Sequence, residues 1–363
     1  MRLCRTETIG PISFYAMLRR FGSAGAALDM LPRLARRGER SRTVTAATRA
    51  EAEAELAALH RAGARLVCWG EPVYPSALAA IEDAPPILTV RGRAELLERP
   101  MVAVVGARNA SANGRRFTRD LAAELGRDGV VVVSGLARGI DAAAHLGALE
   151  TGTVAVVAGG VDVVYPAENR GLHEALARQG AIAAELPLGT EPQARHFPRR
   201  NRIISGMALG VVIVEAAARS GSLITARLAL EQGRDVFAVP GSPLDPRCRG
   251  SNDLLRHGAT LTENAEDVLS QLGALLQHPT PPRSAPSVQL PTTTNWPPAG
   301  AGELIGDDAG IELILERLGP TPVSVDELVR QCHLSAAAVA TLLLELELAG
   351  SVERHPGNLV STR

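Results

Sequence analysis

The architecture follows from one short apolar run, Met101-Val102-Ala103-Val104-Val105-Gly106, which ends in glycine and leads into a helix-length segment. Similar runs recur down the chain, and this alternation is typical of β-α-β units and a parallel sheet. The composition is 46% hydrophobic but only 3% aromatic, so small and branched aliphatic side chains must fill the core. We expect strands at 101–106, 130–134, 153–158, 181–185, 210–214 and 235–239, with helices near 114–127, 140–150, 168–178, 200–209 and 221–232.

Two different regions flank this predicted core. Residues 1–65 have helical spacing with a turn at 22–25, which is typical of a small helical domain of the helix-hairpin-helix or SAM-like kind. After a proline-rich linker at 277–302, residues 303–363 contain three predicted helices and a hairpin, the order of a winged helix. We therefore expect an α/β protein with an extended Rossmann-like parallel-sheet domain at 66–276, whose lead-in is 66–100.

The charge is unevenly distributed although the net charge is only −1. Residues 1–65 carry 12 arginines against 6 acidic residues, and residues 266–363 carry 5 against 12. A basic front suits contact with phosphates, and an acidic tail suits protein contact or solubility. All 38 basic residues are arginine, and the lack of lysine excludes a Walker A loop, a Schiff-base enzyme and a protein kinase.

The sequence predicts neither a metal nor a cofactor. The four cysteines are far apart, and no H-E-x-x-H or G-x-S-x-G run occurs. The loop after 101–106 departs from the dinucleotide-binding fingerprint, and Ser134 stands where that fingerprint expects an acid. We also expect a cytoplasmic protein without membrane contact, because no signal region and no apolar run of about 18 residues occurs.

Turns of small residues follow the predicted strands. In the first, Gly106 lets the backbone approach an anion, the helix start supplies free N–H groups, and Arg108 can close over a phosphate. Because the carboxyl ends of parallel strands meet at one edge of a sheet, the turns predict a shared binding site there. Asp141 is expected mainly to stabilise a helix start, and Asn169 to bind a ligand or cap a turn. The candidate residues of these turns are Gly106, Arg108, Asn109, Ser134, Gly135, Gly139, Asn169, Ser222 and Thr225.

The run Arg195–Gly206 crowds four arginines into eight positions and then becomes apolar. Guanidinium groups match phosphates well, and Phe197 offers a base a stacking face. The alternative is a solvated helix start whose arginines pair with carboxylates. The run alone leaves both interpretations open.

Six runs together resemble the DprA/Smf family of DNA processing proteins: GARNASANG at 106–114, SGLARGIDAAAH at 134–145, YPAEN at 165–169, FPRRNRIISG at 197–206, EAAARSGSLITA at 215–226 and PGS at 240–242. The resemblance implies a non-enzymatic protein that binds single-stranded DNA, self-associates as a homodimer and loads RecA onto incoming strands. In natural transformation it would protect the DNA and displace single-strand-binding protein.

The same resemblance assigns roles to individual residues. It makes Arg108 the arginine of a phosphate pocket, with Ser134, Gly135 and Gly139 shaping the pocket. It places Arg199, Arg200, Asn201 and Arg202 on the rim. Family members often have lysine where this chain has Ala167, and one of the other arginines is the candidate to supply that charge.

Two other functions fit parts of the sequence. A Rossmann-like nucleoside-monophosphate phosphoribohydrolase also has a glycine-rich turn at the sheet edge, but its P-G-G-x-G-T-x-x-E run is missing here. A transcription regulator would use the winged helix to bind duplex DNA. The expected recognition helix from Ser335 carries Glu345 and Glu347 but no arginine, so protein contact is the better prediction for it.

Overall fold

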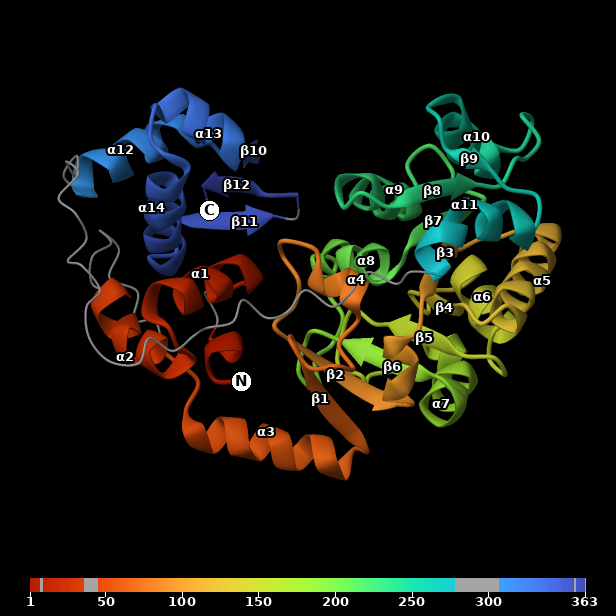
Figure 1. The fold of residues 1–363 in the computed structure, drawn as a ribbon, viewed down its shortest axis with the longest axis horizontal. Coiled ribbons are helices and arrows are strands. Elements are labelled where there is room, and N and C mark those ends of the chain that lie inside the picture. Colours follow the sequence, from red (N-terminus) through yellow and green to blue (C-terminus); the bar gives the residue numbers. More distant parts are fainter. Residues whose placement is uncertain (7–8, 36–44, 278–306, 356, 363) are drawn as a thin grey trace. The chain divides into compact units, whose positions relative to one another are not determined.

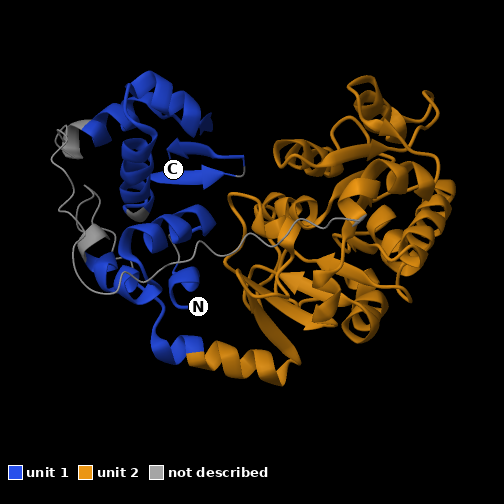
Figure 2. Ribbon diagram, in the orientation of Figure 1, with its two compact units in different colours: residues 1–52, 285–363 blue, residues 53–284 orange. Residues whose placement is uncertain are grey.

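A computed structural model describes residues 1–6, 9–35, 45–277, 307–355 and 357–362. The chain forms two compact units, one of residues 1–52 with 285–363 and the other of residues 53–284 (Figure 2). The expected division at 65, 276 and 302 stays a prediction. The linker expected at 277–302 falls, except for its first residue, outside the described residues.

The larger unit is built on a mixed sheet with the strand order β1-β2-β6-β5-β4-β3-β7-β8-β9 (Figure 1). From β6 to β9 in this order, adjacent strands pair in parallel, whereas β2 pairs antiparallel with both of its neighbours, β1 and β6. All six strands expected from the sequence are confirmed, and β1, β2 and β9 were not predicted as strands. The bounds are β1 Ala64–Cys68, β2 Ile87–Gly92, β3 Met101–Gly106, β4 Val131–Ser134, β5 Thr153–Val156, β6 Ala181–Ala184, β7 Gly210–Val214, β8 Asp235–Ala238 and β9 Thr260–Leu261.

Helices cover both faces of this sheet, and the side chains of β3 show which helices lie on which face. Successive side chains of a strand point to opposite faces. Ala103 and Val105 therefore join the core under α8 and α9, while Val102 and Val104 join the core under α5, α6 and α11. The α-helices of this unit are α4 Ser76–Ala79, α5 Ala112–Arg127, α6 Ile140–Gly147, α7 Arg170–Gln179, α8 His196–Met207, α9 Gly221–Glu231, α10 Arg249–Arg256 and α11 Ala265–Gln277, and α3 Arg49–Arg61 spans the boundary between the units.

The smaller unit contains helices α1 Pro11–Phe21 and α2 Ala24–Ala35 and the expected winged helix. The second helix of the winged helix is capped by Ser324, whose Oγ accepts a hydrogen bond from the Glu327 N–H at 3.2 Å. The three strands pair in the order β10-β12-β11. The winged-helix elements are α12 Asp307–Arg317, β10 Val323–Ser324, α13 Val325–Cys332, α14 Ala336–Leu348, β11 Val352–His355 and β12 Leu359–Thr362.

Helix α14 packs against the N-terminal helices within this unit. Leu344 lies in one apolar core with Met17 and Leu31, and Arg20 pairs with Glu345 at 3.6 Å. The two ends of the chain thus share a core, and the acidic half of α14 is covered by α1 and α2. In the described ranges, no helix is long and apolar enough to cross a membrane.

Candidate functional site

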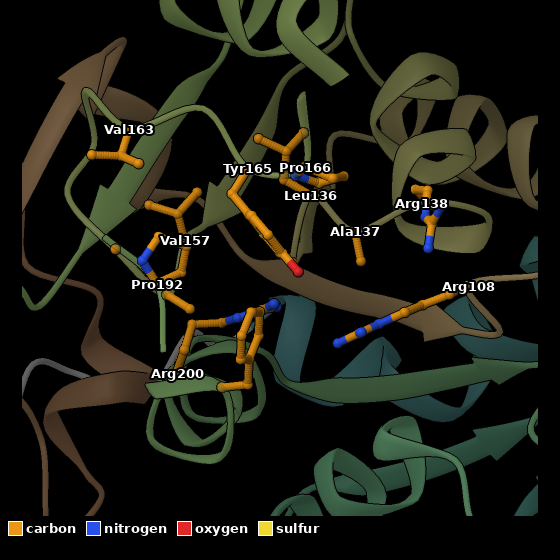
Figure 3. A pocket seen from close by; sticks show the side chains of 14 residues that line it. Arg108, Leu136, Ala137, Arg138, Val157, Val163, Tyr165, Pro166, Pro192 and Arg200 are labelled. Carbon is orange, nitrogen blue, oxygen red and sulfur yellow. The ribbon is translucent and has the colours of Figure 1, made fainter. Parts of the chain in front are cut away.

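A narrow pocket of about 50 Å³ lies at the carboxyl edge of the sheet, where the loops after β3, β4 and β5 meet α8 (Figure 3). The sequence predicted that these loops share one site, and they do. Its lining residues are Arg108, Gly135, Leu136, Ala137, Arg138, Val157, Ala158, Gly159, Val163, Tyr165, Pro166, Pro192, Phe197 and Arg200.

Two arginines and two aromatic rings lie close together in the lining of this pocket. The Arg108 guanidinium lies 5.5 Å from the centre of the Phe197 ring, and that of Arg200 lies 5.9 Å from it. The rings of Tyr165 and Phe197 are 5.7 Å apart. Figure 3 shows the side chains of Arg108, Tyr165 and Arg200 pointing into the same space. Guanidinium groups beside flat rings can bind a phosphate and stack against a base at once.

Arg200 is an unusually buried cation, with only 7% of its surface exposed. Burial lowers the pKa of Arg200 to about 10, and the nearby Asp141 carboxylate opposes that shift. At neutral pH the side chain therefore still carries its charge. Its Nε has no hydrogen-bond partner among the described residues. A cation held in this way is available to a ligand that enters the pocket.

Asp141 supports the turn that carries the pocket. Its carboxylate accepts a hydrogen bond from the Ala137 N–H at 3.3 Å. Burial raises the pKa of Asp141, while the charge of Arg200 works against this rise. The sequence predicted only a helix-start charge for Asp141. The structure adds a charge partner for Arg200, which no local pattern could have revealed.

The loops after β3, β4 and β5 contact one another through residues that were predicted as ligand contacts. Ser134 Oγ donates to the Val104 carbonyl at 2.7 Å, and Asn169 Nδ2 donates to the Leu136 carbonyl at 2.9 Å. Gly139 has a φ of +80° and lies against the backbone carbonyl of Ala107, leaving no room for a Cβ. Ser134 and Asn169 therefore hold the loops in place, and neither lines the narrow pocket.

The start of α5 corrects one expectation. The sequence predicted free N–H groups there that would bind a phosphate. Instead the Ser111 N–H donates to the Glu215 carboxylate at 2.8 Å, and the Gly114 N–H donates to Ser111 Oγ at 2.8 Å. A carboxylate of the chain thus occupies this helix start, so that expectation was wrong. Of this loop, Arg108 is the residue that lines the pocket, while Gly106 packs against the Val214 backbone.

The sequence left open whether the arginines of the run at α8 are available to a ligand or pair with carboxylates, and the structure shows both arrangements. Arg200 lines the pocket, and Arg199 is exposed beside it. Arg202 is 4% exposed and pairs with Glu185 at 2.6 Å and with Asp83 at 3.5 Å, so its charge is used within the fold. Asn201 Nδ2 donates to the Gly221 carbonyl at 3.4 Å. Neither Asn201 nor Arg202 lines the pocket.

Two further candidates lie elsewhere, and two pocket residues were missed. Ser222 and Thr225 are buried in the first turns of α9 and do not line the pocket. Tyr165 and Arg138 do line it, although neither was among the candidates. The sequence signal that could have found them was their position, because each lies in a loop that follows a predicted strand.

The pocket lacks the features of a metal centre. Across the described residues, no group of three or more His, Cys, Asp or Glu side chains is arranged to hold a metal ion. The four cysteines, all within the described ranges, form no disulfide bond.

Three family models, all of the same kind of protein, match successive parts of this chain. The family model described as DNA recombination-mediator protein A matches residues 65–273. Models described as a DprA winged helix domain and a DprA-like N-terminal HHH domain match residues 298–358 and 1–58.

Individual relatives agree with the family models. Protein Smf of Escherichia coli (strain K12) is 38% identical over 318 residues, which are 86% of this chain and 81% of the relative. DNA processing protein DprA of Streptococcus pneumoniae is 45% identical over 200 residues, which are 54% of this chain and 71% of the relative.

Two solved structures resemble more than half of this chain. That of DNA processing protein A from S. pneumoniae has a TM-score of 0.56 and 42% identity, and the match covers 59% of this chain and 77% of that chain. DNA processing protein A from Helicobacter pylori, whose structure is described as showing a unique single-stranded DNA binding mode, has a TM-score of 0.53 and 30% identity. That match covers 58% of this chain and 96% of the other.

Proposed function

Because the chain belongs to the DNA recombination-mediator protein A (DprA/Smf) family, we propose that it binds single-stranded DNA in the pocket of Figure 3 and mediates recombination without catalysing a reaction. The observation that carries the proposal is the pair Arg108 and Arg200, both placed over the Phe197 ring. The H. pylori relative, described as binding single-stranded DNA, supports the choice of ligand.

The chemistry of the pocket supports an unpaired strand over a duplex. Arg108 is exposed and contacts phosphates, while Phe197 and Tyr165 stack against a base. A pocket of about 50 Å³ is too small to admit a paired helix. Because every base has a stacking face, binding has little sequence preference and depends strongly on salt.

The larger role in the cell is part of the same proposal. The protein acts in the cytoplasm as a homodimer, protects incoming single strands, displaces single-strand-binding protein and loads RecA during natural transformation. We expect the winged helix to contact protein and not duplex DNA. Glu345 and Glu347 of its helix α14 are already buried against other residues of the same unit. A helix covered in this way cannot lie in a major groove.

The direct test is a titration of labelled single-stranded and duplex DNA over a range of salt. Arg108→Ala is expected to weaken single-strand binding about tenfold or more, since it removes a contact to a charged group. Arg178→Ala, an exposed position on α7, is the matched control. Unchanged affinity of Arg108→Ala, or preference for duplex, would refute the proposal. Release of free base from nucleoside monophosphates would instead support a phosphoribohydrolase.

A further inference from the structure

A second and larger hollow lies beside the pocket. It holds about 500 Å³, and Arg108 and Arg138 line both spaces. None of its lining residues is acidic, although the exposed Glu168 pairs with Arg138 at 3.4 Å from outside the hollow. The residues that line it are Arg108, Asn109, Arg115, Arg119, Arg138, Gly139, Ala142, Ala143, Leu146 and Asn169.

We propose that this hollow is a second segment of the DNA site, in which Arg115 and Arg119 of α5 bind the backbone of the strand after it leaves the pocket. The inference rests on the proposed single-strand binding. It adds two binding residues that lie outside the six family-like runs and the arginine run, since neither Arg115 nor Arg119 was a candidate from the sequence.

The charges of these two arginines are not used within the fold. No carboxylate among the described residues pairs with Arg115 or Arg119, and both side chains are exposed. Arg202, by contrast, is held by two carboxylates. Exposed guanidinium groups with no acidic neighbour produce a positive potential that attracts phosphates.

The helix places the two guanidinium groups in a row. Residues four apart lie on the same face of a helix, with Cβ atoms roughly 5–6 Å apart. The opposite face of α5 is anchored in the core by Leu121 and Leu125, so the helix that carries the row is held in place on the sheet. A fixed row of cations suits the regular phosphates of a polynucleotide better than a single small anion.

The floor of the hollow suits the other parts of a nucleotide. Leu146 is 47% exposed, and Ala142 and Ala143 beside it leave the backbone of α6 open to close approach. An apolar floor with a cationic wall can contact sugars and bases while the arginines bind phosphates. Since Arg108 and Arg138 border both spaces, one strand can pass from the pocket into the hollow without leaving positive potential.

The test compares two double variants of the full chain on the same helix. Arg115→Ala with Arg119→Ala removes the row, whereas Arg116→Ala with Arg127→Ala removes the same charge from exposed positions that do not line the hollow. Each protein is titrated with an oligothymidylate of about 6 nucleotides and with one of about 24, lengths that bracket common single-strand sites. Thermal unfolding of both variants checks that the fold is intact.

The row variant is expected to bind the short oligonucleotide like the wild type and the long one about tenfold more weakly. Its salt slope on the long oligonucleotide is expected to fall by about 1.4, since each phosphate contact on a single strand contributes about 0.7. Full affinity at both lengths, equal loss at both lengths, or the same loss in the control variant would overturn the proposed track. A wild-type protein that binds neither oligonucleotide would instead refute single-strand binding altogether.

Discussion

Gly135 and Arg200 lie in such close contact that any Cβ at position 135 would overlap the Arg200 guanidinium. The turn after β4 and the helix α8 are far apart in the sequence, yet the charged end of Arg200 occupies the space that a side chain at 135 would need. Arg200 in turn lies over the ring of Phe197 in the pocket. The missing side chain at 135 is therefore what admits the buried cation to the pocket.

The substitution Gly135→Ala is expected to push Arg200 out of the pocket. The group that must move is the far end of a flexible side chain, so the unfolding free energy is expected to fall by less than the roughly 1–3 kcal/mol that overpacking costs in a rigid core. Single-strand affinity is expected to fall about tenfold, because a charged contact is lost. Fluorescence anisotropy and urea unfolding measure the two effects. Gly171→Ala on α7 is the control, since a Cβ there meets no atom within 4 Å; wild-type affinity in Gly135→Ala would contradict this account.

Arg202 and Arg199 are expected to respond oppositely to substitution by alanine. Arg202→Ala removes the buried cation that pairs with Glu185 and Asp83, which is expected to cost about 3–5 kcal/mol of unfolding free energy. Arg199→Ala, at an exposed position, is expected to change stability by less than about 0.5 kcal/mol. It is expected to weaken single-strand binding instead. Urea unfolding and anisotropy on both variants test this division, and a stable Arg202→Ala protein would disprove it.

His145 makes stability depend on pH. Its Nδ1 lies 2.8 Å from Thr153 Oγ1, whose hydroxyl already donates to the Val132 carbonyl, so Nδ1 carries the proton. Nε2 is buried without a partner among the described residues, and burial lowers the pKa of His145 to about 3. The unfolded chain takes up this proton near pH 6.5 but the folded chain does not. The contribution of His145 to the free energy of unfolding is therefore fully present above pH 6.5, and it is lost as the pH falls toward 3.

The expected loss is about 1.4 kcal/mol of unfolding free energy for each pH unit below 6.5, or about 2 kcal/mol at pH 5. Urea unfolding at pH 7 and pH 5 measures it, with His145→Gln as the comparison that removes the titrating group. The wild type is expected to lose more stability between these pH values than the variant does. Equal losses would show that His145 is not buried as a neutral side chain.

Glu347 joins the two ends of the chain. Its carboxylate accepts hydrogen bonds from Ser13 of α1 and, at 3.2 Å, from Arg354 Nε of β11. Glu347→Ala leaves the half-buried Arg354 uncompensated and is expected to cost this unit about 3 kcal/mol of stability. Glu316→Ala, at an exposed position of α12, is the control. Thermal unfolding that does not distinguish the two variants would contradict a shared core.

The sequence alone predicted the parallel core well, because its signal is local. Runs such as 101–106 and 210–214 are apolar throughout, short, rich in valine and next to a glycine, which is typical of a strand buried on both faces. β1 was missed because only one of its five residues is fully buried, so it carries no such run. β2 is largely buried, but prolines precede it and its antiparallel pairing depends on two distant partners.

The site divides in the same way. Arg108, Gly135 and Phe197 could be predicted, since glycine turns after strands and an arginine run next to an aromatic residue are features of adjacent residues. Which arginines are free could not be predicted. Arg200 lines the pocket, whereas Arg202 pairs with Glu185 and Asp83. The carboxylate of Glu215 accepts a hydrogen bond at the start of α5. These pairings depend on distances between groups in the folded chain, which the sequence does not show. The order of neighbouring residues in the sequence determined the strands and turns. Folding brought distant charged groups together, and their pairing determined which arginines can still bind a ligand.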